Sequence, residues 1–400
     1  MIPYVHKGGR PKRRIHRRAW CLLISLIVIV SSSHGQWISD PAVDAKVQRG
    51  IDYIYNIEFE KANKEFAEVI RLAPDHPAGY FFQAMTEWWR ILSNFDDETR
   101  DKAFLEMLDR VVVMCEKRLD KNENDVTALF FKGGAVGFKG RLRANRGAWL
   151  AAANDGLVAL PAIRKANKLE PANYDVLLGM GIYNYYADVV PSQYPIVKPL
   201  MIFLPGGDKK KGLEQLELAA QKARYAKVEA EYFLLQTYFS YEKQFVRALE
   251  IARELHAKYP KNPLFHRMYG RCYVSLGYSA DAYQIFSEVE ERYRNHQEGY
   301  DDYDVREAYY YIGRHLFQAG RLDDALRNFY RCDEVSRKID KSSPSGFMSM
   351  TNLAVGMIYD LQGKRGSALA QYQKVLNMKE FENTYRDARR YMEKPYSRAQ

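Results

Sequence analysis

The chain has 400 residues, 47% of them hydrophobic and 14% aromatic, which is enough apolar material for at least one sizeable core. Its formal net charge is +10, but residues 1–35 hold seven Lys or Arg and no acid, so about +3 remains on the rest. So small a charge over roughly 365 residues argues against a phosphate-binding surface, and we expect no nucleic-acid partner.

Residues 1–35 have the organisation of a secretory signal. A basic segment precedes an apolar run from Ala19 to Val30, and the small residues Ser33 and Gly35 are placed for cleavage before Gln36. The run is shorter than the roughly 20 residues that span a bilayer. We therefore expect an exported protein, periplasmic or associated with the cell envelope, with an uncleaved membrane anchor as the alternative.

Residues 36–220 predict an N-terminal region of irregular helix pairs. The clearest pair has Gly50 and Tyr53 on its first helix and Ala62 and Phe66 on its second. Further along, the apolar spacing predicts an amphipathic helix near Lys102–Leu119 and two long helices within residues 126–170. Another helix is expected from Asp175 to Ala187, and its partner is expected to begin near Gly212.

A Pro-rich insert at residues 188–208 separates these last two helices. Prolines 191, 195, 199 and 205 exclude one regular helix across it, and it cannot cross a membrane. If exposed, its apolar side chains could dock on a protein or membrane surface. If folded back, they would fill a seam between helices. The possible docking loop comprises Ile196, Val197, Leu200, Met201, Ile202, Phe203 and Leu204.

Residues 221–400 contain the clearest internal repeat. Alanines of the expected second helices occur at 248, 282, 325 and 368, separated by 34 residues and then twice by 43. In one unit Gly270 leaves room for a neighbouring helix and Phe286 fills the space between the two helices. Gly313 with Phe329, and Gly356 with Tyr372, repeat the design. One such hairpin cannot bury its apolar face alone, so neighbouring hairpins must stack.

These residues resemble the tetratricopeptide repeat, whose pattern is Leu-Gly-x2-Tyr, then Ala-x3-Phe-x2-Ala, then a closing Pro. The first unit closes at Pro74 and another at Pro260, whereas the two 43-residue units lack the closing Pro. The resemblance implies an all-α solenoid of stacked antiparallel helix pairs. It also implies a non-enzymatic scaffold that binds a protein or peptide in a concave groove.

In this family the first helices line the groove. The corresponding side chains here are Phe233, Tyr241, Arg267, Arg271, Tyr310, Arg314 and Phe317. Arginines interleaved with aromatic rings would suit an extended peptide that carries carboxylates. Family members that grip a C-terminal carboxylate use Lys and Asn, and this chain has no matching Asn. Alternatively, the arginines pair with acids of adjacent helices, such as Glu307 or Asp281.

The sequence predicts no catalytic residue, cofactor or metal site. Its histidines lie on different units without His-x3-His spacing, and it has no Gly-x-Ser-x-Gly motif.

Two alternatives to the scaffold remain open. One is a peripheral membrane or envelope-assembly factor that docks through the insert, whose Leu-Pro-Gly-Gly-Asp stretch is similar to tetratricopeptide-like proteins of the mitochondrial outer membrane. The other is an enzyme with a helical-repeat fold. The partner and the oligomeric state stay open.

Overall fold

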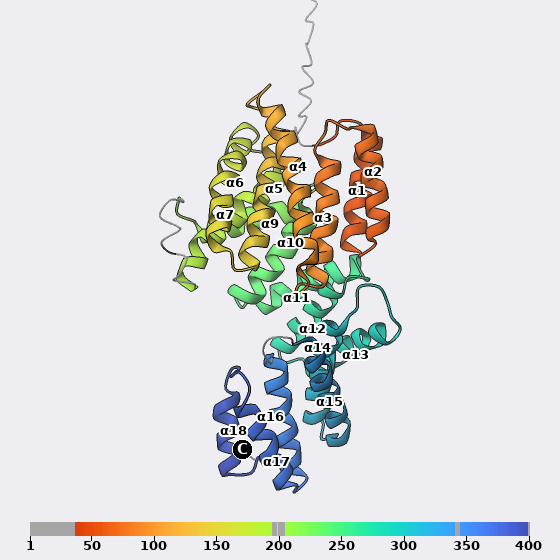
Figure 1. The fold of residues 1–400 in the computed structure, drawn as a ribbon, viewed down its shortest axis with the longest axis vertical. Helices are drawn as coiled ribbons and strands as arrows, with labels where there is room; N and C mark the ends of the chain where they lie inside the picture. Colours follow the sequence, from red (N-terminus) through yellow and green to blue (C-terminus); the bar gives the residue numbers. More distant parts are fainter. Residues whose placement is uncertain (1–36, 194–197, 199–204, 341–344, 399–400) are drawn as a thin grey trace, which may run out of the picture. The chain divides into compact units, whose positions relative to one another are not determined.

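The computed structural model describes residues 37–193, 198, 205–340 and 345–398, and the regular elements within these ranges are helices (Figure 1). The N-terminal segment 1–36 and all seven residues of the possible docking loop lie outside the described residues. Successive helices pack as antiparallel pairs, so the expected solenoid is confirmed. The pairs are α1 (Pro41–Tyr55) and α2 (Phe59–Leu72), α3 (Ala78–Ser93) and α4 (Asp101–Leu119), α5 (Val126–Asn145) and α6 (Trp149–Leu169), α7 (Tyr174–Gln193) and α9 (Lys209–Lys222), α10 (Lys227–Gln236) and α11 (Phe245–Lys258), α12 (Pro263–Ser275) and α13 (Ser279–Arg294), α14 (Asp302–Gln318) and α15 (Leu322–Ile339), and α16 (Gly346–Leu361) and α17 (Arg365–Leu376), with α18 (Thr384–Glu393) following.

The helix starts follow from local chemistry. The Asp40 carboxylate accepts a hydrogen bond from the Ala42 amide at 2.8 Å, and Pro41 occupies the first helical position, where no amide hydrogen is needed. Asn262 and Pro263 repeat this arrangement at the start of α12. Asp208 caps α9 by accepting from the Lys211 amide at 2.9 Å.

The glycine–aromatic seams form as the repeat pattern predicts. A Cβ on Gly270 would lie 2.8 Å from the Phe286 ring, and a Cβ on Gly313 would lie 2.8 Å from the Phe329 ring. Real Cβ atoms do not approach rings this closely, so each glycine is what permits the aromatic side chain to fill the seam. The repeat alanines at 248, 282, 325 and 368 are all buried.

The helix expected to end at Ala187 instead continues as α7 to Gln193, through Pro191. The returning chain is tied along this extension. The Asp208 amide donates to the Asn184 carbonyl oxygen at 2.9 Å, and the Lys209 amide donates to the Asp188 carboxylate at 2.9 Å. These bonds fix the end of α7 to the start of α9, so the first residues of the expected insert belong to the helix.

One hydrophobic cluster extends from Ile38 to Cys272 and therefore crosses the boundary placed at residue 220. Hydrogen bonds between residues far apart in the sequence join the two ends of this cluster. The Tyr259 hydroxyl donates to the Asp52 carboxylate at 2.7 Å, and the Asn262 side-chain amide donates to the Tyr55 carbonyl oxygen at 2.8 Å. The first helix is thus packed against α11 and α12, and first helices of several pairs share one core.

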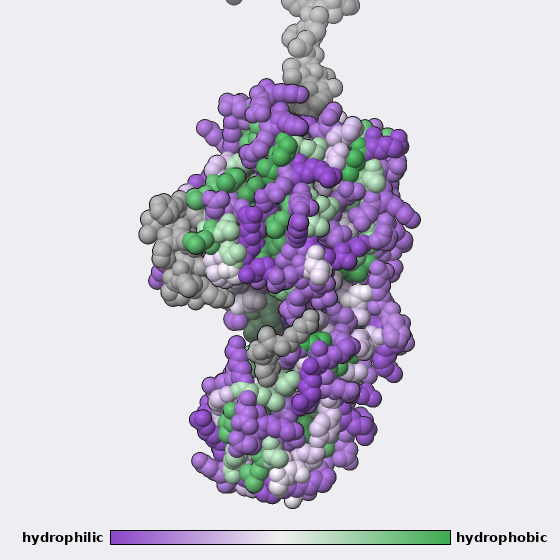
Figure 2. Space-filling model, viewed as in Figure 1, coloured by the Kyte–Doolittle hydropathy of each residue, from purple (hydrophilic) through white to green (hydrophobic). Residues whose placement is uncertain are grey.

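The surface is predominantly hydrophilic in the view of Figure 2, with apolar side chains gathered in several places over the upper helices. On α6 the side chains of Leu150, Leu157 and Val158 are 73%, 42% and 44% exposed. Within the described ranges, no helix is both long and apolar enough to pass through a bilayer. Cys115, Cys272 and Cys332 are free and buried, as expected for small apolar side chains on helices.

Candidate functional site

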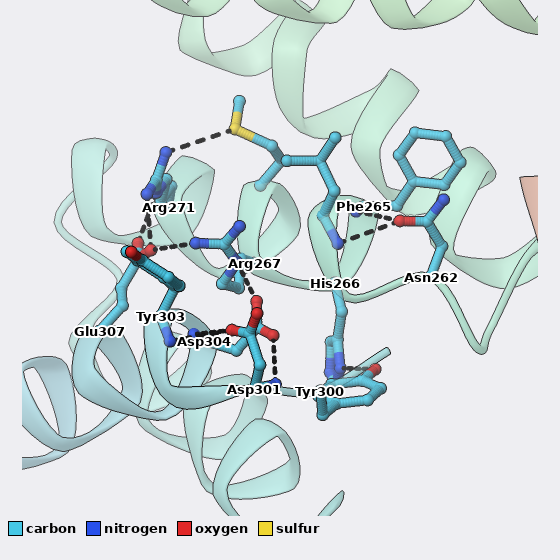
Figure 3. Close-up of polar contacts among 12 residues, drawn as sticks. Asn262, Phe265, His266, Arg267, Arg271, Tyr300, Asp301, Tyr303, Asp304 and Glu307 are labelled. Atoms are coloured by element: carbon cyan, nitrogen blue, oxygen red, sulfur yellow. Dashed lines mark hydrogen bonds and ion pairs between the residues drawn. The ribbon is translucent and has the colours of Figure 1, made fainter. Parts of the chain in front are cut away.

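The seven expected groove residues fall in two separate places. Phe233 and Tyr241 belong to α10 and the π-helical turn that follows it, at Thr237–Tyr241. The other five lie on α12 and α14, whose side chains meet directly (Figure 3). The structure therefore brings Arg267, Arg271, Tyr310, Arg314 and Phe317 onto one neighbouring pair of first helices and leaves the first two residues elsewhere.

Phe233 is 6% exposed and belongs to the core. The Arg141 guanidinium carbon lies 4.3 Å from the centroid of the Phe233 ring and 4.9 Å from that of Trp88. Arg141 also donates to the buried Glu229 carboxylate at 2.8 Å. Tyr241 packs its ring against Tyr185 and Tyr186. Most of the Phe233 surface is consequently covered by other side chains of this chain.

Arg267 and Arg271 converge on the same carboxylate (Figure 3). Arg271 donates to Glu307 through Nε and through a terminal nitrogen, the latter at 2.6 Å, and Arg267 donates to Glu307 at 3.3 Å. The Arg267 Nε atom also lies 2.6 Å from Asp304, an ion pair without hydrogen-bond geometry. Of the two acids proposed as intramolecular partners, the structure uses Glu307, and it adds Asp304.

Asp304 is oriented by the start of its own helix. Its carboxylate accepts from the Asp301 amide at 2.8 Å, while the Asp301 carboxylate accepts from the Tyr303 amide at 2.8 Å. This reciprocal capping box places Asp304 in the first turn of α14, beside Arg267. The acid is therefore held in position by the backbone before it meets the arginine.

The pKa values of Asp304 and Glu307 are shifted in opposite directions. Burial raises the pKa of Asp304 to about 7, although Arg267 opposes the rise. Burial also opposes ionisation of Glu307, but Arg271 and Arg267 more than offset it and hold the pKa of Glu307 below its usual value. The two arginines thus keep Glu307 ionised, whereas burial disfavours the ionised form of Asp304.

Arg314 is exposed, and its guanidinium carbon lies 5.9 Å and 5.8 Å from the ring centroids of Tyr310 and Tyr311. No carboxylate of the described residues forms an ion pair with it. Tyr310 is 8% exposed and donates through its hydroxyl to the Met350 sulfur on α16 at 3.3 Å. Phe317 is partly covered by the chain's own C-terminal segment, because the Arg398 guanidinium carbon lies 5.7 Å from its ring centroid and Arg398 donates to its carbonyl oxygen at 2.7 Å.

Residues not singled out from the sequence complete this surface. The Tyr310 ring lies 5.4 Å from Phe347, which joins α14 to α16. We call the surface of Arg271, Tyr310, Tyr311, Arg314, Phe347 and Met350 the α12–α14–α16 face. The Gly356 and Tyr372 seam predicted that α16 starts a further pair, but the sequence held no signal for which of its side chains would lie beside Tyr310.

The first helices α14 and α16 lie side by side, and each second helix packs behind its own first helix through a glycine–aromatic seam. The chain has a tetratricopeptide-like repeat fold. No protein-family model matches this repeat protein, and no curated protein matches it.

Solved structures similar to this tetratricopeptide-like chain include three repeat proteins of low sequence identity. YrrB, a TPR protein with an unusual peptide-binding site, is 16% identical with a TM-score of 0.38, and the match covers 57% of this chain and 98% of that one. The human IFIT1 dimer with m7Gppp-AAAA is 14% identical with a TM-score of 0.41, covering 90% and 89%. Yeast Tom70 is 12% identical with a TM-score of 0.36, covering 85% and 86%.

Proposed function

We propose that this protein is a binding scaffold that holds an acidic peptide, or an acidic segment of a protein, on its α12–α14–α16 face. The observation that carries the proposal is Arg314, an exposed guanidinium above two tyrosine rings with no ion-pair partner among the described residues. Arginine in this setting can pair with a carboxylate through two parallel hydrogen bonds, and arginine and tyrosine are enriched among the residues that dominate binding energy.

Side chains beside Arg314 offer further contacts to a bound peptide. The Arg271 side chain is 33% exposed, and its remaining terminal nitrogen faces the Met268 sulfur at 3.9 Å, which is a weak acceptor. That nitrogen can therefore donate to a ligand carboxylate while the other two stay on Glu307. Phe347 and Met350 are half-buried and offer apolar area next to these cations. An acidic segment with interspersed apolar side chains matches this combination.

The proposal predicts that Arg314→Glu weakens peptide binding at least tenfold, because it places a carboxylate where the ligand's carboxylate should pair. Ligands would be selected by display of a random peptide library on the full chain, and their affinities measured by fluorescence anisotropy. The matched control is Arg327→Glu on α15, whose side chain is 66% exposed and pairs with Asp324. This control makes the same charge change on a second helix and should leave binding unchanged.

Either of two results would contradict the proposed function. The selected peptides could lack acidic residues, or both substitutions could weaken binding equally, which would indicate a general charge effect instead of a defined face. Circular dichroism of both variants verifies that the helices are intact. Because Arg314 is exposed and forms no ion pair with the described residues, its substitution should change the free energy of unfolding by no more than about 0.5 kcal/mol.

We also propose that the protein acts outside the cytoplasm. The basic, apolar and small-residue segments of residues 1–35 support this proposal. Expression of the full chain in a bacterium with two membranes, followed by fractionation and intact-mass measurement, should recover a periplasmic chain that begins at Gln36. Recovery of the full-length chain in the membrane fraction would favour an anchor, and a full-length cytoplasmic chain would contradict export.

A further inference from the structure

Three side chains with no metal-binding spacing in the sequence meet between consecutive helices. His256 lies in the last turn of α11, His266 in the first turn of α12, and Glu288 on α13. One potential ligand atom from each lies within 4.8 Å of the other two. The imidazole rings are nearly parallel, with an interplanar angle of 11° and centroids 4.2 Å apart. The fold thus brings together three side chains whose spacing in the sequence does not predict a metal site.

Two ring nitrogens in this cluster lack hydrogen-bond partners. The His266 side chain is fully buried, and its Nε2 atom has no hydrogen-bond partner among the described residues. It lies 3.6 Å from the Glu288 carboxylate. Within the described chain, the buried His256 Nδ1 atom is likewise without a hydrogen-bond partner. Buried polar atoms in native proteins are nearly always satisfied, so two unsatisfied ring nitrogens beside one carboxylate indicate a missing partner, either a water molecule or an ion.

We propose that His256, His266 and Glu288 bind a divalent transition-metal ion, and that zinc is the ion their donor atoms fit best. Two imidazole nitrogens and one carboxylate oxygen form a common zinc ligand set, whereas calcium and magnesium prefer oxygen ligands alone. A water molecule would complete a four-coordinate shell. This inference is independent of the peptide-binding proposal, because none of the three ligands belongs to the α12–α14–α16 face.

Outer contacts already orient two of the three ligands. The His266 Nδ1 atom lies 2.9 Å from the Tyr300 hydroxyl (Figure 3), and Gln284 donates to one Glu288 oxygen at 3.3 Å. A hydrogen on His266 Nδ1 that donates to Tyr300 leaves the Nε2 lone pair free for a metal. The second Glu288 oxygen is the one directed at His266. Metal-binding histidines and carboxylates characteristically have such supporting hydrogen bonds.

Burial keeps both imidazoles neutral, but it also opposes placing a cation here, and one nearby group adds to that cost. Burial lowers the pKa of His266 to about 2 and that of His256 to about 4, and Arg292 contributes to both shifts. Both rings are therefore neutral and need not release a proton to bind a metal. The Arg292 charge also repels a cation, because its guanidinium donates to the Pro260 carbonyl oxygen and the Tyr300 hydroxyl, which are uncharged and leave its positive charge uncompensated.

Binding requires the ligand atoms to move closer and one imidazole ring to turn, because the in-plane lone pairs of two nearly parallel stacked rings do not converge on one point. Metal–nitrogen distances near 2.0–2.1 Å in tetrahedral geometry place ligand atoms roughly 3.3 Å apart, closer than the present upper separation of 4.8 Å. The Glu288 side chain is 39% exposed and His256 is half-buried, so these two can adjust toward the fixed His266. An ion bound in this way would tie α11, α12 and α13 together and so join two successive helix pairs.

The test is zinc titration of the full chain after removal of its affinity tag and of bound metal. Isothermal calorimetry should detect one ion bound per chain with a dissociation constant in the micromolar range or below. Cobalt should give visible absorption bands typical of a four-coordinate site. Glu288→Gln and His256→Gln should each weaken zinc binding at least tenfold. The matched control, His315→Gln, changes a histidine that contacts Ser279 at 3.0 Å and should bind zinc as the wild type does.

Glu288 and His256 are chosen because neither is fully buried, so their variants should fold, and circular dichroism verifies this. A thermal melt gives a second readout: saturating zinc should raise the melting temperature of the wild type but not of the two variants. Absence of stoichiometric binding to the folded wild-type chain would overturn the proposal. So would undiminished zinc affinity in both variants, which would place the ion on histidines elsewhere in the chain.

Discussion

Replacing Arg267 and Arg271 together with alanine is expected to lower the free energy of unfolding by about 3–5 kcal/mol. The Asp304 and Glu307 side chains are only 3% and 1% exposed, so the double substitution leaves two buried carboxylates without a cation. The cost of that uncompensated burial exceeds the attraction that is lost. Urea denaturation of the full chain measures the effect.

A variant without the four charges separates the cost of burying unpaired carboxylates from the loss of arginine side-chain packing. Arg267→Met, Arg271→Met, Asp304→Asn and Glu307→Gln combined remove all four charges while nearly keeping side-chain volume. This variant should recover most of the stability lost in the alanine variant, because replacing a whole buried ion-pair group is often neutral. A loss below about 1 kcal/mol in the alanine variant would contradict the structure, since it would mean that water reaches both acids.

Trp89→Ala is expected to lower the free energy of unfolding by about 3–5 kcal/mol, the range for large buried aromatic side chains. Trp89 is 2% exposed and belongs to α3. Its ring centroid lies 4.9 Å from that of Tyr55 on α1, 5.3 Å from Tyr232 on α10 and 5.6 Å from Phe265 on α12. One side chain thus supports helices from four different pairs.

Hydrogen exchange can show which helices are destabilised by the Trp89→Ala substitution. Amide protection in the Trp89→Ala variant should fall in α1, α10 and α12 as well as in α3, and should be retained in α16 and α17. The matched control is Trp149→Ala, whose side chain is 42% exposed and should cost no more than about 0.5 kcal/mol. Loss of protection restricted to α3 would show that the shared core does not couple these helices.

The regular part of the fold could be predicted because its rules are local. A glycine on one helix and an aromatic residue on the next meet at a fixed sequence separation, so Gly270 with Phe286 was recognisable without a structure. The end of α7 was misplaced because Pro191 normally argues against a helix, and the bonds from residues 208 and 209 that support this segment come from the returning chain.

The candidate site is only partly predictable, because ion pairs between arginines and acids depend on distances in space that the sequence does not give. The sequence offered both Glu307 and Asp281 to the arginines, and only the packing of α12 on α14 selects Glu307. Asp304 was missed because its position comes from a capping box with Asp301. Repeat register placed Phe233 among the groove residues, but register cannot reveal that Arg141 from a distant pair covers its ring.

The closure of α1 onto α11 and α12 restricts how this chain can change in length. Open repeat arrays have contacts only between neighbours, so they tolerate gain or loss of one unit. Here the Tyr259–Asp52 and Asn262–Tyr55 hydrogen bonds join residues 207 positions apart. Adding or deleting a pair between α2 and α10 would rotate these partners out of reach. A change in the number of helix pairs within this segment should therefore cost these contacts, and the high contact order of the segment should make its folding slow relative to that of α14–α17.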